Sequence, residues 1–99
     1  MFGLARWYRL AAEQGYAPAQ LNLGVMYAHG TGVDKDEAEA VRWYRKAAEH
    51  IPEAQYRLGV MYAQGTGVDK DEAEAARWYR IAADHGFPAA KKALQKLVK

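Results

Sequence analysis

An internal repeat constrains this 99-residue chain more than any other feature, because the stretch from Ala19 to Ala48 recurs almost unchanged from Ala54 to Ala83. Aligned without gaps, the two copies differ only at Leu21/Tyr56, Asn22/Arg57, His29/Gln64, Val41/Ala76 and Lys46/Ile81. A period of about 35 residues is typical of stacked helical units. Such units share a continuous core with their neighbours and expose a long surface that usually binds a partner.

The composition is that of an ordinary folded domain. Apolar residues make up 51% of the chain and charged residues 26%, which argues against disorder. Alanine is abundant and β-branched residues are scattered, which favours helix. The net charge of +2 is too small to indicate a nucleic-acid or acidic-membrane partner, so we predict neither.

One unit reads as two helices joined by a loop. Helix A is expected from Pro18 to His29, where apolar residues recur with helical spacing. Gly30 to Val33 then break the helix, with Gly30 suited to a left-handed cap and Val33 expected to plug the loop onto the core. Helix B follows, capped by either Asp34 or Asp36 because both have capping-box spacing, and it should end near residue 50.

The same pattern continues toward both ends of the chain. Helix A recurs from Pro52 to Gln64, and the loop and helix B from Gly65 to His85. The chain opens inside a helix B at Trp7–Glu13 and closes with a helix A variant, Pro88–Val98, whose outer side is rich in lysine. We therefore predict six antiparallel helices in B-A-B-A-B-A order and no strands. The single domain 1–99 would divide into a partial repeat 1–15, repeats 16–50 and 51–85, and a capping helix 86–99.

Glycine and tryptophan recur at fixed positions of each unit. Gly24 and Gly59 lie inside helices, where glycine costs about 1 kcal/mol relative to alanine. We expect them to admit the close approach of a helix B aromatic residue, Tyr44 or Trp43. The tryptophans recur once per unit, so all three are expected in core or inter-repeat contacts: Trp7, Trp43 and Trp78.

The turn between the middle helix B and the next helix A is irregular. His50-Ile51-Pro52 is one residue shorter than the corresponding turns at Gly15 and Gly86, and it has no glycine. A helix can end without glycine but at some cost in strain, so we expect local distortion at this junction.

Arginine pairs on the B helices would form a basic stripe when the units stack. However, acidic residues lie three positions before or four after these arginines, and such spacings place opposite charges side by side on a helix. We therefore expect a self-neutralised surface with pairs such as Glu39/Arg42 and Arg45/Glu49.

The chain offers little for catalysis or metal binding. It contains neither serine nor cysteine, which removes the commonest hydrolytic nucleophiles and any disulfide or thiolate site. The three histidines are isolated, and two of them, His50 and His85, hold equivalent positions at helix ends where a capping role suffices. We predict no enzyme activity, no cofactor and no metal site.

The residues that recur between copies resemble those of the Sel-1-like repeat, a relative of the tetratricopeptide repeat. The resemblance rests on Ala19-Gln20, Leu23-Gly24, Tyr27, Gly30-Thr31-Gly32-Val33, Ala40, Trp43-Tyr44 and Ala47-Ala48. It covers essentially the whole chain. The resemblance implies an all-α, right-handed α-solenoid that acts as a scaffold or adaptor, often in bacterial proteins. Some secreted relatives carry disulfides and are linked to β-lactam binding, but this chain lacks cysteine.

The surface of the A helices is the candidate partner site, because three of the five differences between the copies fall there. We expect it to line a concave groove that binds a protein or peptide segment. Its predicted residues are Leu21, Asn22, Val25, His29, Tyr56, Arg57, Val60 and Gln64.

Two alternatives remain open at this point. The half-unit at the start would leave apolar residues of its helix uncovered, including Phe2, Leu4, Trp7 and Leu10, so the chain would self-associate there or belong to a longer array. The other is a β-lactam-binding relative, which would need a convergent polar pocket. The chain as given shows no signal peptide or membrane span, so a cytoplasmic location is the default expectation.

Overall fold

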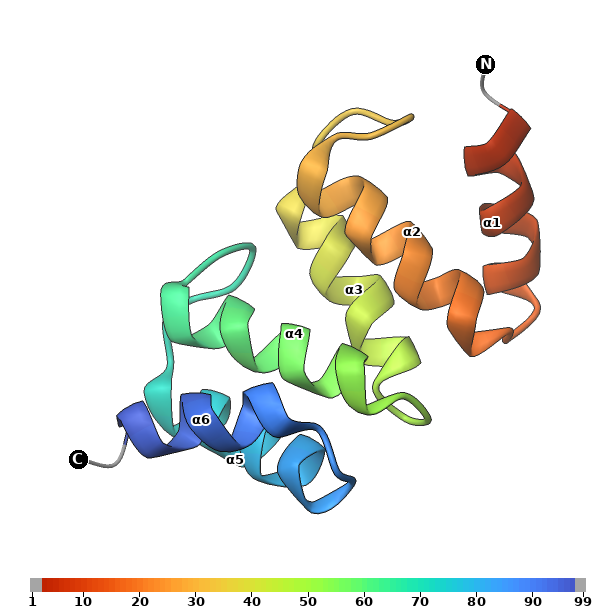
Figure 1. Ribbon diagram of the computed structural model, residues 1–99. Coiled ribbons are helices and arrows are strands. Elements are labelled where there is room, and N and C mark those ends of the chain that lie inside the picture. Colours follow the sequence, from red (N-terminus) through yellow and green to blue (C-terminus); the bar gives the residue numbers. More distant parts are fainter. Residues whose placement is uncertain (1–2, 98–99) are drawn as a thin grey trace.

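The computed structural model describes residues 3–97, and every regular element in that range is an α-helix (Figure 1). The six helices are α1 (Gly3–Glu13), α2 (Ala17–His29), α3 (Glu37–Ala47), α4 (Pro52–Gln64), α5 (Glu72–Asp84) and α6 (Pro88–Leu97). Consecutive helices pack against one another to form an α-solenoid of 45 × 24 × 16 Å. The predicted order and the absence of strands are confirmed within this range. The predictions for Phe2 and Val98 fall outside it.

In both complete units, a glycine of helix A leaves room for the tyrosine ring of helix B that packs against it. We call this contact the glycine notch. A Cβ built on Gly24 would lie 2.6 Å from Cε1 of Tyr44, and one built on Gly59 would lie 2.7 Å from Cδ1 of Tyr79. No side chain fits at such distances, so glycine is required for the helices to approach this closely. The predicted packing role of the glycines is confirmed, with tyrosine rather than Trp43 as the partner.

The loop between α2 and α3 settles which aspartate caps helix B. Gly30 adopts the left-handed conformation with φ of 70°, and the Asp36 N–H donates to the Tyr27 carbonyl oxygen at 2.9 Å. Asp36 then accepts from the Glu39 N–H at 3.0 Å. Asp36, and not Asp34, is therefore the N-cap.

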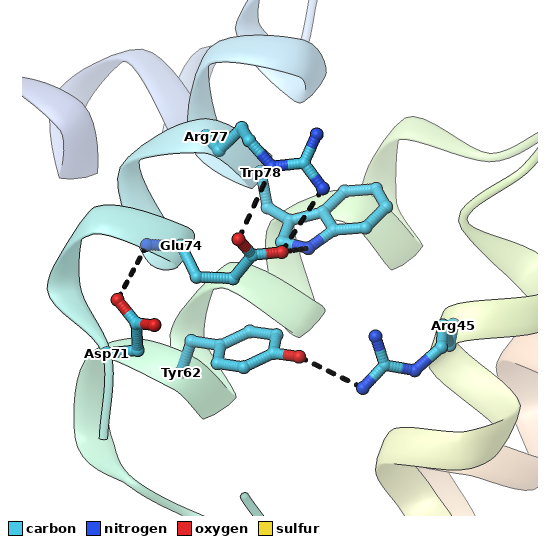
Figure 2. Close-up of polar contacts among 6 residues, drawn as sticks. All are labelled: Arg45, Tyr62, Asp71, Glu74, Arg77 and Trp78. Carbon is cyan, nitrogen blue, oxygen red and sulfur yellow. Dashed lines mark hydrogen bonds and ion pairs between the residues drawn. The ribbon is translucent and has the colours of Figure 1, made fainter. Parts of the chain in front are cut away.

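The second unit repeats this loop and cap. Asp71 accepts from the Glu74 N–H at 3.0 Å at the start of α5 (Figure 2). The Glu74 side chain in turn accepts from the Arg77 guanidinium at 3.2 Å and from the indole nitrogen of Trp78 at 3.1 Å. One acidic residue thus links the helix start to two side chains of the next turn.

The distortion predicted at the middle junction takes the form of an early helix end, and no residue there adopts a strained left-handed conformation. Helix α3 ends at Ala47, earlier than predicted, and Ala48 keeps right-handed dihedral angles with φ of −64°. The Ile51 N–H donates to the Ala47 carbonyl oxygen at 2.9 Å. In the final junction, Phe87 makes the equivalent bond to Ala82 at 3.1 Å across one more residue. Ending the helix sooner therefore preserves the same closing hydrogen bond without a left-handed residue.

The core forms three successive clusters along the solenoid, and the tryptophans occupy them unequally. Trp43 is 3% exposed and packs between α1 and α2, where Val33 also packs as predicted. Trp78 is half-buried against the central cluster. Trp7 is 73% exposed, so its predicted core or inter-repeat contact is wrong. The indole of Trp7 has no helix A over it within the described residues.

Candidate functional site

The A-helix surface is less open than the sequence suggested. Asn22, His29 and Gln64 are exposed as expected. The other five predicted residues are half-buried: Leu21, Val25, Tyr56, Arg57 and Val60. The A-helix surface is therefore partly a packing surface against the central and last core clusters.

Three of the predicted residues come together in one groove. Tyr56, Val60 and Gln64 of α4 line a hollow of about 470 Å³ that also involves α6. The remaining wall is mostly apolar, from Ala63, Tyr79, Ala89, Ala93 and Leu97. Lys92 and Lys96 of α6 are exposed and supply its cations. We call this hollow the α4–α6 groove.

Aromatic packing fixes the position of Tyr56 in this groove. Its ring centroid lies 5.7 Å from that of Tyr79 and 5.3 Å from that of Phe87, in tilted arrangements that favour aromatic attraction. Burial raises the pKa of Tyr79, and the neighbouring Tyr56 raises it further. The Tyr79 hydroxyl therefore stays protonated at neutral pH, and the groove wall remains uncharged on that side.

The predicted residues of the first copy do not form an equivalent groove. Leu21 and Val25 pack against the central core cluster. Asn22 lies in a different hollow beside α1, and the His29 ring contacts the Val25 carbonyl oxygen at 3.0 Å. The eight predicted residues are thus distributed over several sites and do not form one continuous surface.

Arg57 also interacts with residues of its own unit and of the preceding one. Its guanidinium pairs with Glu53 at 3.0 Å, one helical turn away. It also lies close enough to Tyr44 to lower the pKa of that hydroxyl, although the larger effect is burial, which raises the Tyr44 pKa. Arg57 therefore joins the outer surface of α4 to the buried tyrosine of α3.

The expected pairing of helix B arginines is confirmed for one set and wrong for another. Arg42 meets Glu39 at 3.3 Å, as predicted from spacing. Arg45, however, donates to the Tyr62 hydroxyl at 3.0 Å and lies over its ring, with the guanidinium carbon 5.8 Å from the centroid (Figure 2). Arg9 makes the same pair of contacts with Tyr27. These arginines connect α1 to α2 and α3 to α4.

Buried glutamines are a second contact that the sequence analysis missed. The Gln20 side chain donates to the Ala12 carbonyl oxygen at 3.1 Å, and Gln55 donates to that of Ala48 at 2.8 Å. Both bonds go to a carbonyl oxygen at the end of a helix B, and the Ala12 oxygen also accepts from the Gly15 N–H at 3.0 Å. Their recurrence after alanine in both copies was the signal that could have revealed them.

A polar cleft of about 500 Å³, separate from the α4–α6 groove, lies between the ends of α1 and α3. Its walls carry both charges, from Arg9, Glu13, Lys46 and Glu49, and also include Trp43.

Across residues 3–97, no three His, Asp or Glu side chains gather so that they could hold a metal ion. Within the same range, no helix combines the length and apolar character needed to cross a membrane.

Solved structures of similar chains share this architecture. A Sel1 repeat protein from Oxalobacter formigenes is 51% identical and superimposes with a TM-score of 0.89, over 92% of this chain and 69% of that one. The antigen c5321 of uropathogenic Escherichia coli, which displays an SLR fold, is 49% identical with a TM-score of 0.87, over 89% of this chain and 19% of that one. The cysteine-rich protein B of Helicobacter pylori is 28% identical with a TM-score of 0.87, over 93% and 70%.

Curated relatives match over a shorter stretch. The chitin synthase regulators SKT5 of Malassezia restricta and Saccharomyces cerevisiae are 43% and 44% identical over 44 and 43 residues. These matches span 44% and 43% of this chain but only 3% and 6% of the length of those proteins. The Sel1 repeat profile, in contrast, matches residues 5–16, 17–50 and 52–87. The chain therefore belongs to the Sel1 repeat family.

Proposed function

We propose that the protein is a non-catalytic interaction module whose α4–α6 groove binds a segment of a partner protein. Sel1 repeat proteins are generally protein-interaction modules, which supports the class of function. The observation that carries the choice of site is the groove itself. It joins Tyr56 and Gln64, two of the positions at which the copies differ, to an apolar wall and two lysines.

The chemistry of the groove favours a partner segment of a particular kind. The apolar wall between Val60 and Ala93 would cover one or two apolar side chains, and that burial would contribute the main attraction. Lys92 and Lys96 would then attract an acidic residue beside them, which contributes more to partner choice than to affinity. We therefore expect a short segment in which apolar and acidic residues are neighbours.

The groove is also preformed. The ring of Tyr56 is held by two aromatic neighbours, and Gly59 locks α4 onto α5 through Tyr79. A rigid surface loses little conformational entropy on binding, so a modest contact area can yield measurable affinity.

A peptide selection tests this proposal without knowledge of the natural partner. A random peptide library would be selected against the whole chain, and we expect enrichment of sequences that combine apolar and acidic residues. The doubly reversed variant Lys92→Glu/Lys96→Glu should weaken the selected peptides by about tenfold, roughly the 1.4 kcal/mol expected for two lost charge contacts.

The matched control reverses two exposed lysines that do not line the groove, Lys35→Glu/Lys46→Glu, in the loop before α3 and near the end of α3. This control should bind the selected peptides as the unchanged chain does, apart from the small effect of its altered net charge. If both double variants bind equally, or if the selected peptides share no acidic residue, the groove is not the binding site.

A further inference from the structure

The polar cleft between the ends of α1 and α3 shares no residue with the α4–α6 groove and gathers charges that the fold leaves unpaired. Glu13 of α1, Lys46 of α3 and Glu49, which follows α3, are exposed and line it. Within residues 3–97, none of the three forms an ion pair. Single unpaired charges are common on surfaces, but here both signs, from two helices, share one hollow of about 500 Å³. The hollow therefore offers pairing groups to a ligand.

The charges of the polar cleft are ordered along it. On α1, Arg9 precedes Glu13 by four residues. On α3, Arg42 and Lys46 come first, and Glu49 follows just beyond the helix end. Both helices run from the upper to the lower part of the view in Figure 1. The cations therefore lie toward one end of the cleft, and the carboxylates lie toward the other.

Contacts inside the fold hold the arginines of the cationic end in place. The Arg9 guanidinium donates to the Tyr27 hydroxyl, and Arg42 pairs with Glu39 at 3.3 Å. A guanidinium has five N–H donors, and neither contact uses all of them. Both arginines can therefore bind a carboxylate without giving up these partners.

The corresponding junction between α3 and α5 differs in two ways. Its arginine and acidic positions carry the same charges, but Ile81 replaces Lys46. A ring nitrogen of His85 lies 3.2 Å from the side-chain oxygen of Gln55. The side chain of His50, the counterpart of His85, makes no hydrogen bond within the described range. A lysine and a histidine are thus free at the first junction and replaced or engaged at the second.

Trp43 also lines the polar cleft and differs from its counterpart in the next unit. The indole nitrogen of Trp78 donates to Glu74 at 3.1 Å (Figure 2). The indole nitrogen of Trp43 is buried and has no hydrogen-bond partner in the part of the chain that the structure describes. A buried donor without an acceptor is costly. The surroundings of Trp43 therefore lack an acceptor, which a ligand with a carboxylate would bring.

We propose that the polar cleft binds a small zwitterion of the dipeptide class. The ligand carboxylate would lie between Arg9 and Arg42 with Lys46 beside it, and the ligand ammonium group would lie between Glu13 and Glu49. Four residues of a helix rise about 6 Å, and two extended residues span at most about 7 Å. The two charged ends of a dipeptide therefore match the two ends of the cleft, whereas a free amino acid is too short to reach both.

A chemical-shift titration of the isotope-labelled chain tests this proposal, with glycylglycine as the probe. We expect saturable shifts of the Gly15 amide and of the Trp43 indole, because both residues line the cleft. N-acetylglycylglycine lacks the ammonium group, glycylglycine amide lacks the carboxylate, and glycine is too short. Each of these three compounds should bind at least about fivefold more weakly, because it loses the ion pairs at one end.

Variants of the chain test each end of the cleft. Lys46→Ile copies the second junction and should weaken glycylglycine binding about threefold, and Glu13→Gln/Glu49→Gln should weaken it about tenfold. The matched controls are Lys91→Ile and Glu72→Gln, which change exposed residues of α6 and α5 that do not line the cleft. They should bind glycylglycine as the unchanged chain does. Circular dichroism would verify that all variants remain folded.

Each contrary result has a defined meaning. The absence of saturable shifts with glycylglycine, or equal binding of the blocked dipeptides, overturns the proposal. Tighter binding of N-acetylglycylglycine would assign the cleft to anions, and tighter binding of the amide would assign it to cations, so either result contradicts a zwitterion site. Equal weakening by the control variants would show that the net charge, and not the cleft, determines binding.

Discussion

Helices α1 and α3 carry the same Trp-Tyr-Arg motif but differ sharply in burial. Trp43 of α3 is 3% exposed, whereas Trp7 of α1 is 73% exposed. The arginine contact is nevertheless the same in both, since Arg9 and Arg45 each reach the tyrosine of the following helix A. What differs is the helix A that precedes α3 and has no counterpart before α1 in the described chain.

The comparison shows that the environment of a repeated residue depends on which neighbours are present on each side. Contacts toward the following unit are formed in both helices, and contacts toward the preceding unit are formed only in α3. In a linear array, stability is a sum of unit and interface contributions, so an open end lacks one interface. The predictions below test this difference.

Removal of the two tryptophans should have the most unequal effects. Trp43→Ala leaves a large cavity between α1 and α2 and should lower the free energy of unfolding by about 3–5 kcal/mol. Trp7→Ala removes a side chain that is mostly in water and should change it by no more than about 0.5 kcal/mol. Urea denaturation followed by circular dichroism would measure both. Similar losses in the two variants would mean that the helices are equally covered.

The glycine notch should be the next most sensitive position. Gly59→Gln places a side chain against the ring of Tyr79 and should cost about 1–3 kcal/mol through overpacking. Gly3→Gln is the matched control, because a Cβ at Gly3 meets nothing within 4 Å. Its melting temperature should equal or exceed that of the unchanged chain. A tolerated glutamine at position 59 would show that the close approach of α4 and α5 does not require glycine.

Loss of a helix cap should have a smaller effect. Asp71→Ala removes the acceptor for the Glu74 N–H at the start of α5 and should cost about 1 kcal/mol. Asp69→Ala, two residues earlier in the same loop, makes no capping bond and serves as the control. Thermal unfolding would separate them. If the two substitutions had equal effects, the assignment of the cap to the second aspartate of each loop would fail.

Ionisation of the buried tyrosines should change the stability of the folded chain only at alkaline pH. Burial raises the pKa of Tyr44 and of Tyr79 in the folded chain, whereas an unfolded tyrosine ionises at about 10. Unfolding above that pH therefore releases protons, so stability should be constant below about pH 10 and should fall as the pH rises further. Denaturation between neutral pH and pH 11 would measure the slope, which Tyr79→Phe should reduce. An unchanged slope would show that Tyr79 ionises freely in the folded state.

The sequence predicted the helices well because each signal was local. Apolar spacing located the six helices, and Gly30 ended α2 where its left-handed conformation was expected. The choice between two capping aspartates could not be made locally, since it depends on a hydrogen bond from Asp36 to Tyr27 across the loop. The early end of α3 likewise depends on how Ile51 closes onto Ala47.

The candidate site was harder to predict, because exposure depends on helices that are distant in sequence. Position 56 differs between the copies, so Tyr56 was expected to be an exposed binding residue. Instead, the ring of Phe87, in the connection between α5 and α6, packs against it. Arg45 had an acidic residue at suitable spacing, but Tyr62 of the next helix takes the contact. The spacing of residues along the sequence identifies possible partners on the same helix. It does not show whether a residue on another helix makes the contact instead.

The most direct test of this account is the accessibility of each tryptophan measured separately. Chains that retain one tryptophan, with phenylalanine at the other two positions, would be compared by acrylamide quenching under native conditions. The account predicts strong quenching of Trp7, intermediate quenching of Trp78 and near-complete protection of Trp43. Equal quenching of Trp7 and Trp43 would contradict it, because both helices would then be covered, or open, to the same extent.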